Sequence, residues 1–293
     1  MSKKGLIGVQ MSTIAPNKMP KFDAYESMAR LADIGYKCIE ISQVPMTKEN
    51  VAGFRRAIDE LGFNVAAISA NVAPNPIMPG FEALSNPDDF KKMVADAKAL
   101  DCDMMRIGAM PMEARFSLQA ALDFAKEADE YACKLAEHGI DLYYHNHHFE
   151  FGRHDGKFLM DIIKENTTRL GFELDVHWIH RGGVDPVKYI NECAGRIRLL
   201  HLKDYRIAHM KQPEVDFNTK EGMMAAYAAM NEIVQFAEVG EGTLDIPACI
   251  EAGLNGGSEY FLVEQDMSYG RDPFDCLKDS RDHLIELGYE SWF

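Results

Sequence analysis

The chain has 293 residues, 47% of them hydrophobic, and its 31 Lys and Arg residues against 46 Asp and Glu residues give a net charge of −15. This length and composition suffice for one large hydrophobic core. Because an acidic surface repels phosphate backbones and anionic lipids, neither nucleic acid nor a membrane is an expected partner, whereas a small molecule is.

The cysteines and the N-terminal residues indicate the compartment. The six cysteines are widely spaced and form no C-x-x-C pair, which argues against a disulfide framework or a zinc knuckle. No signal-peptide pattern is present, and no apolar run approaches the roughly 20 residues that a membrane-spanning helix needs. We therefore expect reduced thiols and a cytoplasmic protein.

Short apolar runs alternate with longer amphipathic stretches along the whole chain. The runs predict strands over Leu6–Gln10, Tyr36–Ser42, Phe63–Ala70, Asp103–Gly108, Ile140–His145, Leu170–Asp175, Ile197–Lys203 and Tyr260–Asp266. The amphipathic stretches predict helices over Ala24–Ile34, Lys48–Leu61, Asp88–Leu100, Leu118–His138, Phe158–Glu165, Pro186–Cys193, Ile246–Ala252 and Pro273–Leu287. Strict alternation implies parallel strands, so eight such units predict an α/β fold, a (β/α)8 TIM barrel with residues 1–293 as a single domain.

One long interruption, at about residues 206–238, follows the seventh predicted strand. It contains a Met- and Ala-rich helical stretch over Gly222–Asn231. A lid over the barrel or a contact in a homo-oligomer would use such a segment, and ordinary packing of the stripe is the alternative.

Ionisable residues gather where the last four predicted strands end, which is where barrels of this type place catalysis. The strand ends read His145–Glu150, Glu173–Trp178, His201–Asp204 and Glu264–Asp266. Because alternate residues of a strand share a face, Glu173, Asp175 and His177 are predicted to point into the barrel.

Inward carboxylates are costly without positive charge, and a bound divalent cation is the simplest compensation. Glu150, Asp175, His201 and Glu264 offer oxygen ligands and one imidazole, which suits Mn²⁺, Mg²⁺ or Co²⁺, with Zn²⁺ as an alternative. Taken singly, each residue is more often an ordinary core or surface group. Glu173 has an alternative partner in Arg106 or Lys203.

At these residues the chain resembles the xylose isomerase-like barrel superfamily of sugar phosphate isomerases and epimerases. The motifs are Tyr144–Phe151, Leu174–Trp178 with Gly183–Pro186, His201–Asp204, Val239–Gly242 and Val263–Asp266. The resemblance implies one divalent metal on a Glu, an Asp, a His and a Glu, at positions matching Glu150, Asp175, His201 and Glu264. In hydroxypyruvate isomerase and tagatose epimerase relatives, however, the first Glu precedes a Pro where this chain has His145-Asn146. Its pattern is more similar to inosose dehydratase-like enzymes and to the metal subunits of deglycosidases that act on 3-keto sugars.

Isomerisation, epimerisation and dehydration of sugars begin alike, with removal of a proton next to a carbonyl and a metal-stabilised enediolate. His145 or His147 is the expected base, and Glu150 and Glu264 are further candidates for catalysis. Lys203 would donate to a substrate oxygen. The expected substrate-binding residues are His177, Trp178, Arg106, Arg181 and Arg271, of which the last two suit a terminal hydroxyl or phosphate.

The sequence therefore predicts a metal-dependent isomerase or epimerase acting on a small sugar or polyol. A carbohydrate lyase, either inosose dehydratase-like or a deglycosidase of 3-keto glycosides, is the alternative. A DNA-repair endonuclease of the same fold is disfavoured by the charge of −15 and the limited ligand set. A barrel that binds sugar without turnover is a further alternative.

Overall fold

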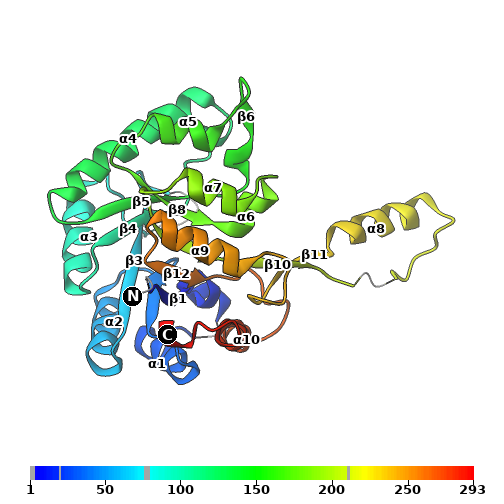
Figure 1. Cartoon of the computed structure of the whole chain (residues 1–293), viewed down its shortest axis with the longest axis horizontal. Helices are drawn as coiled ribbons and strands as arrows, with labels where there is room; N and C mark the ends of the chain where they lie inside the picture. The colour runs from blue at the N-terminus through cyan, green and yellow to red at the C-terminus, as the bar shows by residue number, and fades with distance from the viewer. Residues whose placement is uncertain (1–3, 20, 76–79, 210–211) are drawn as a thin grey trace.

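The computed structural model describes residues 4–19, 21–75, 80–209 and 212–293. Eight parallel strands close into a barrel in the order β1-β12-β9-β8-β5-β4-β3-β2 (Figure 1). The barrel strands are β1 Leu6–Gln10, β2 Cys38–Ile41, β3 Asn64–Ala70, β4 Met104–Ile107, β5 Asp141–His145, β8 Gly171–Asp175, β9 Ile197–Leu202 and β12 Tyr260–Val263. The predicted TIM barrel is confirmed, with each observed strand inside its predicted range.

Helices cover the outside of the barrel, one or two after each strand (Figure 1). They are α1 Ala24–Ile34, α2 Lys48–Leu61, α3 Pro87–Ala99, α4 Leu118–Ala136, α5 Leu159–Glu165, α6 Val176–Arg181, α7 Pro186–Glu192, α9 Ile246–Gly256 and α10 Pro273–Glu286. Asp23 caps the first of them by accepting from the Glu26 backbone N–H at 3.0 Å, and Gly35 ends it in the left-handed region with φ 116°. The six-residue α6 was not predicted.

The inside of the barrel consists of layers that arise from the alternation of side chains along each strand. Apolar side chains fill one layer: Cys38, Ala66, Ala67, Met104, Tyr143, Leu199 and Leu262. Two residues further along the same strands stand Glu40, Arg106, His145, His201 and Glu264, all buried. The apolar layer thus forms the floor beneath a polar layer at the carboxyl ends of the strands.

Two small antiparallel strand pairs lie outside the barrel sheet. A two-residue hairpin pairs β6 Arg153–His154 with β7 Lys157–Phe158. The predicted insertion forms an antiparallel ribbon of β10 Asp204–Ile207 and β11 Val234–Ala237, with α8 Lys220–Asn231 between them. Figure 1 shows this segment projecting away from the barrel. Residues 210–211 of the insertion lie outside the described residues. In the described part of the chain, every helix is too short or too polar to cross a membrane.

Candidate active site

His201, at the end of β9, lies at the centre of the buried polar layer. Its Nδ1 lies 2.9 Å from Glu264 Oε2, and its Nε2 lies 3.0 Å from Glu40 Oε2 and 3.3 Å from Glu173 Oε1. Burial opposes a charge on this ring, but the neighbouring carboxylates raise the pKa of His201 well above its usual value. The imidazole therefore joins two groups of carboxylates, one on each ring nitrogen.

The group on the Nδ1 side has the composition of a metal site. His145, Asp175, His201 and Glu264 each offer a ligand atom, and these four atoms lie within 4.8 Å of one another. Among the described residues, neither His145 Nδ1 nor Asp175 Oδ2 has a well-directed hydrogen bond, although both atoms are buried and lie 3.3 Å from Glu173 and from Lys203, respectively. Buried polar atoms without such bonds are expensive, so this set fits a divalent cation. Three of the four predicted ligands are thus brought together.

A second group on the Nε2 side, formed by Glu40, Glu173 and His201, also brings ligand atoms close together. Here, however, a guanidinium already supplies the positive charge, because Arg106 Nε lies 2.6 Å from Glu40 and 3.4 Å from Glu173. Burial alone would raise the pKa of Glu40, but Arg106 and His201 lower it to about 2. Burial and the charge of Glu40 raise the pKa of Glu173 to about 8. The predicted pairing of Glu173 with Arg106 is observed.

Glu150 is not brought together with the other three predicted ligands. After β5 the chain turns through a short 3-10 helix, Phe149–Phe151, which carries Glu150 back against the strand. Its carboxylate accepts from the Tyr144 hydroxyl at 2.5 Å and from the His147 backbone N–H at 2.8 Å. Burial raises the pKa of Glu150 to about 7. At the strand end itself stands His145, which occupies the place in the ligand group that the prediction gave to Glu150.

Lys203 places a positively charged side chain next to the candidate metal site. Its Nζ lies 2.9 Å from Glu264, 2.9 Å from Asp266 and 3.3 Å from Asp175. Burial disfavours the charged amine, but the three carboxylates outweigh it and raise the pKa of Lys203 above its usual value. The amine is therefore a charged donor beside the ligand carboxylates. Its Nζ also lies 4.9 Å from the centre of the Trp178 ring.

The two predicted bases, His145 and His147, lie side by side. The rings of His145 and His147 are 4.9 Å apart, edge to face. Burial and nearby positive groups lower the pKa of His147 to about 3 and that of His145 well below its usual value. Among the described residues, His147 Nδ1 has no hydrogen-bond partner. A neutral ring with a free nitrogen can accept a proton from a bound molecule.

A cavity of about 500 Å³ opens onto this layer. Five of the predicted site residues line it: Arg106, His145, His147, Lys203 and Glu264. Its other walls are both polar and apolar, and include Ser42, Ser69, Asn71, Phe81, Met110, Met112 and Arg115. The volume suits a monosaccharide or a somewhat larger ligand.

The remaining predicted binding residues are not among those that line this cavity. His177 stands on α6, not on the strand, and its ring contacts those of Tyr205 and Phe236 at 5.1 and 5.0 Å. The prediction that the strand alternation continues to His177 is wrong, because Asp175 ends the strand and caps α6 by accepting from the Trp178 backbone N–H. Arg181 lies 5.7 Å from the Trp178 ring.

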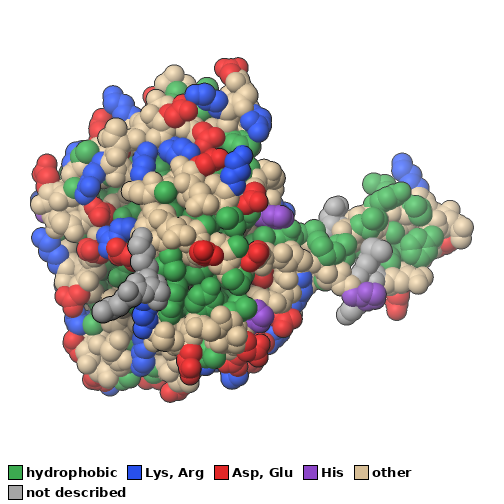
Figure 2. Space-filling model, viewed as in Figure 1, with side chains coloured by type: hydrophobic (Ala, Val, Ile, Leu, Met, Phe, Trp, Pro, Cys, Tyr) green, Lys and Arg blue, Asp and Glu red, His purple; other side chains and the backbone are tan. Residues whose placement is uncertain are grey.

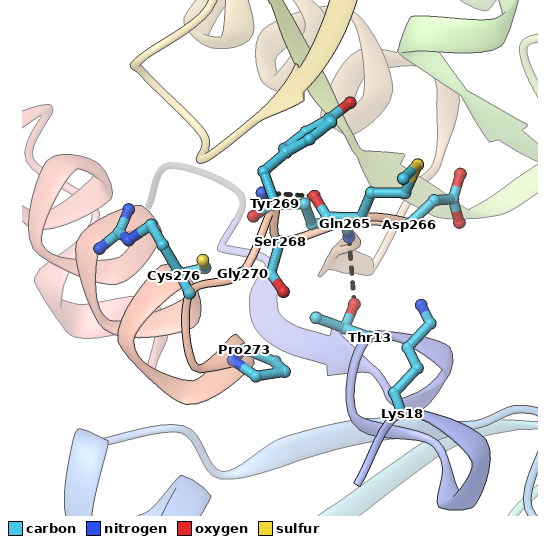
Figure 3. A pocket seen from close by; sticks show the side chains of 11 residues that line it. Thr13, Lys18, Gln265, Asp266, Ser268, Tyr269, Gly270, Pro273 and Cys276 are labelled. Carbon is cyan, nitrogen blue, oxygen red and sulfur yellow. Dashed lines mark hydrogen bonds between the residues drawn. The ribbon is translucent and has the colours of Figure 1, made fainter.

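Arg271 lines a second cavity, of about 340 Å³, next to the start of α10. Figure 3 shows that Thr13, Lys18, Gln265 and Asp266 surround the same space. The guanidinium of Arg271 is already paired, with Glu238 at 2.6 Å and with Asp279 at 2.5 Å. Its position beside these two carboxylates leaves little free charge for a substrate phosphate.

The sequence did not predict the side chains that contact the candidate metal ligands His201 and Glu264. Glu40 on β2 contacts His201, while Gln10 Nε2 and Ser12 Oγ donate to Glu264 Oε1 at 2.9 and 2.8 Å. A signal for Glu40 existed, since it is an acidic residue inside the otherwise apolar strand Cys38–Ile41. Gln10 and Ser12 carry no such signal, because polar residues at a strand end are common.

Comparison with known proteins agrees with this fold. The family model described as xylose isomerase-like TIM barrel matches residues 28–287. The chain belongs to this family. A curated inosose dehydratase from Geobacillus thermodenitrificans (strain NG80-2) is 28% identical over 154 residues, which is 52% of this chain and 49% of that protein. The match thus spans about half the length of that relative.

Solved structures of the same fold extend over nearly the whole chain. A sugar phosphate isomerase/epimerase from Parabacteroides distasonis ATCC 8503 superposes with a TM-score of 0.71 at 20% identity, covering 97% of this chain and 99% of that one. The IOLI protein, whose crystal structure contains a bound zinc atom, superposes with a TM-score of 0.65 at 14% identity, covering 98% and 99%. At these identities the likeness concerns the fold.

Proposed function

We propose that this family member is a divalent-metal-dependent enzyme that removes a proton next to a carbonyl of a small sugar or polyol, as an isomerase or epimerase. The observation that carries the proposal is the convergence of His145, Asp175, His201 and Glu264, all buried, whose ligand atoms lie within 4.8 Å of one another. The zinc atom in the IOLI protein supports a cation in a barrel of this shape. Mn²⁺ is the cation we expect, with Mg²⁺, Co²⁺ and Zn²⁺ as alternatives.

A divalent cation at this site would supply positive charge beside the substrate oxygens as a proton leaves the neighbouring carbon. Residues of the protein would remove the proton and position the substrate. We assign His145 to the ligand group, which leaves His147 as the base, since it lines the cavity and its Nδ1 has no hydrogen-bond partner among the described residues. Glu150 holds the His147 backbone in place through the bond of 2.8 Å.

Lys203 and Trp178 would position the substrate. The charged Lys203 amine reaches both the ligand carboxylates and the cavity, so it can donate to the oxygen on which negative charge develops. Trp178 closes the side of the site next to this amine. Arg106 lines the cavity but is paired with Glu40 at 2.6 Å, so we propose that it holds Glu40 and Glu173 in place instead of binding substrate charge.

A lyase that dehydrates a keto-inositol is the second candidate, and the similarity to an inosose dehydratase favours it. The two reactions share the proton removal and differ in the fate of the enediolate, which either loses water or is reprotonated. A lyase product has lost the mass of water, whereas an isomer keeps the substrate mass. Mass spectrometry of products from a panel of keto sugars and inososes therefore separates the two candidates.

The proposal is tested by metal content and turnover in two variants, His145→Ala and Glu264→Gln. Both should bind less Mn²⁺ than the wild-type chain and lose turnover over the panel. The matched control is His154→Ala, which changes a histidine on the small β6–β7 hairpin. Wild-type metal content and turnover in both variants would refute the proposed site.

A further inference from the structure

The insertion forms an arm, defined here as residues 204–237, whose apolar side chains are exposed. On α8, Met224 and Tyr227 are each 63% exposed, and apart from Gly222 the helix residues with described side chains are exposed or half-buried. Exposed apolar residues of the arm are Ile207, Phe217, Met223, Met224, Tyr227, Met230 and Val234. Figure 2 shows hydrophobic side chains gathered on the surface of the projecting end of the molecule. Contiguous apolar surface of this kind on a protein marks a contact site.

The root of the arm is firmly fixed, so its direction is set by the barrel. Phe236 packs on the rings of His177 and Trp178, and its backbone N–H donates to the Tyr269 hydroxyl at 3.0 Å. Arg206 pairs with Glu238 at 3.2 Å. The arm leaves the barrel where β9 ends, on the face that carries the candidate active site, and projects away from it (Figure 1).

A second apolar surface, the rim patch, stands on the same face of the barrel. It consists of Met112 and Phe116, in the loop that follows β4, and Phe116 is 82% exposed. Met112 also lines the cavity of the candidate active site. Each chain thus carries both a projecting apolar arm and an uncovered apolar rim beside its cavity.

We propose that the arm docks on the rim patch of a second copy of this chain, and that the two copies exchange arms across a two-fold axis. With a two-fold axis, the arm of each chain covers the rim patch of the other, so the assembly closes as a dimer and cannot grow into a chain of copies. At about 100 Å² of exposed apolar surface for each of its seven side chains, one arm offers roughly 700 Å², near the ~800 Å² per partner of a standard stable interface. The partner's α8 would then lie at the mouth of the cavity.

The oligomeric state of the full chain tests this proposal without any need for activity. By sedimentation we expect a dimer of the wild-type protein at micromolar concentration. Met224→Glu and Tyr227→Glu should each raise the dimer dissociation constant at least about a hundredfold, because each change occurs twice across a two-fold interface. The control Leu287→Glu, at a residue 39% exposed just after α10, should leave the dimer unchanged. A monomeric wild-type chain, or dimers that persist in both arm variants, would overturn the proposal.

Cross-linking then locates the arm on its partner. In a Cys133→Ser background, which removes the exposed native thiol, chains carrying Phe116→Cys are mixed with chains carrying Tyr227→Cys and treated with a short bismaleimide. We expect a cross-link between the two kinds of chain. Cross-linking of Tyr227→Cys chains with each other alone would mean that arms pack on arms and would overturn docking on the rim. A cross-link confined within single chains carrying both changes would mean that the arm folds back as a lid, which also overturns it.

Discussion

Glu40→Gln is the sharpest test of how the candidate metal site is held together. Glu40 is fully buried on β2 and lies 3.0 Å from His201 Nε2, while Arg106 donates to its other oxygen at 2.6 Å. A neutral His201 ring that donates its Nε2–H to this carboxylate would direct an unprotonated Nδ1 at Asp175 and Glu264. Glu40 would therefore fix the tautomer in which His201 can be a ligand.

The size of the effect can be worked out from these contacts. Loss of a carboxylate that orients a ligating histidine costs roughly 10–100-fold in metal affinity, or about 1.4–2.7 kcal/mol. In the metal-free chain the same change breaks a buried ion pair with Arg106, for which about 3–5 kcal/mol of unfolding free energy is typical. Glutamine keeps an oxygen that can accept from Arg106, so we expect the lower end of that range.

Two measurements separate these contributions. Titration calorimetry with Mn²⁺ and with Zn²⁺ gives the metal dissociation constant, and denaturant unfolding in a chelator gives the stability of the metal-free chain. Glu286→Gln is the control, because the side chain of Glu286 is 78% exposed and remote from the site. A Glu40→Gln chain that is less stable yet binds metal like the wild type would show that Glu40 supports the fold only and does not orient His201.

Three further predictions concern stability. The pKa of Asp129 is lowered because the backbone N–H groups that it accepts from, just before β8, outweigh its burial. Asp129→Asn should therefore lower the free energy of unfolding by about 2 kcal/mol at neutral pH. Denaturant unfolding should show this difference between the two chains vanish as the pH falls below the usual carboxyl range, where Asp129 becomes protonated. Gly242→Ala should lower the melting temperature, since a Cβ there would overlap the buried Asp204 carboxylate, which binds the backbone of that loop; an unchanged melting temperature would contradict this. Lys203→Met should lower the free energy of unfolding of the metal-free chain by about 3–5 kcal/mol, because it leaves the buried carboxylates of Asp175 and Glu264 without their positive partner. Added Mn²⁺ would replace that positive charge, so it should raise the melting temperature of this variant more than that of the wild type.

The barrel was predictable because its signal is repeated eight times. Each strand is a short apolar run and each helix an amphipathic one, so errors at single boundaries do not change the alternation. Asp175, His201 and Glu264 were predictable for a related reason, since the carboxyl end of a parallel barrel strand fixes where a side chain points without any knowledge of its neighbours.

Glu150 shows where this reasoning stops. It lies five residues beyond the end of β5, and the path of those residues depends on how a short 3-10 helix packs against the strand. No alternation rule describes such a turn. The arm is a similar case, because a Met- and Ala-rich stripe is typical of buried helices, whereas the direction of α8 is set by the β10–β11 ribbon at its root.

The presence of His145 in place of Glu150 changes the expected chemistry of the site. The group now offers two imidazoles and two carboxylates instead of one imidazole and three carboxylates. Imidazole nitrogen suits Zn²⁺, Co²⁺ or Mn²⁺ better than Mg²⁺, which prefers oxygen ligands and retains water. One fewer carboxylate would also reduce the negative charge around a bound cation, and the charged Lys203 amine would reduce it further. A cation held there would be less fully neutralised, so it would lower the pKa of a substrate C–H next to a carbonyl more strongly.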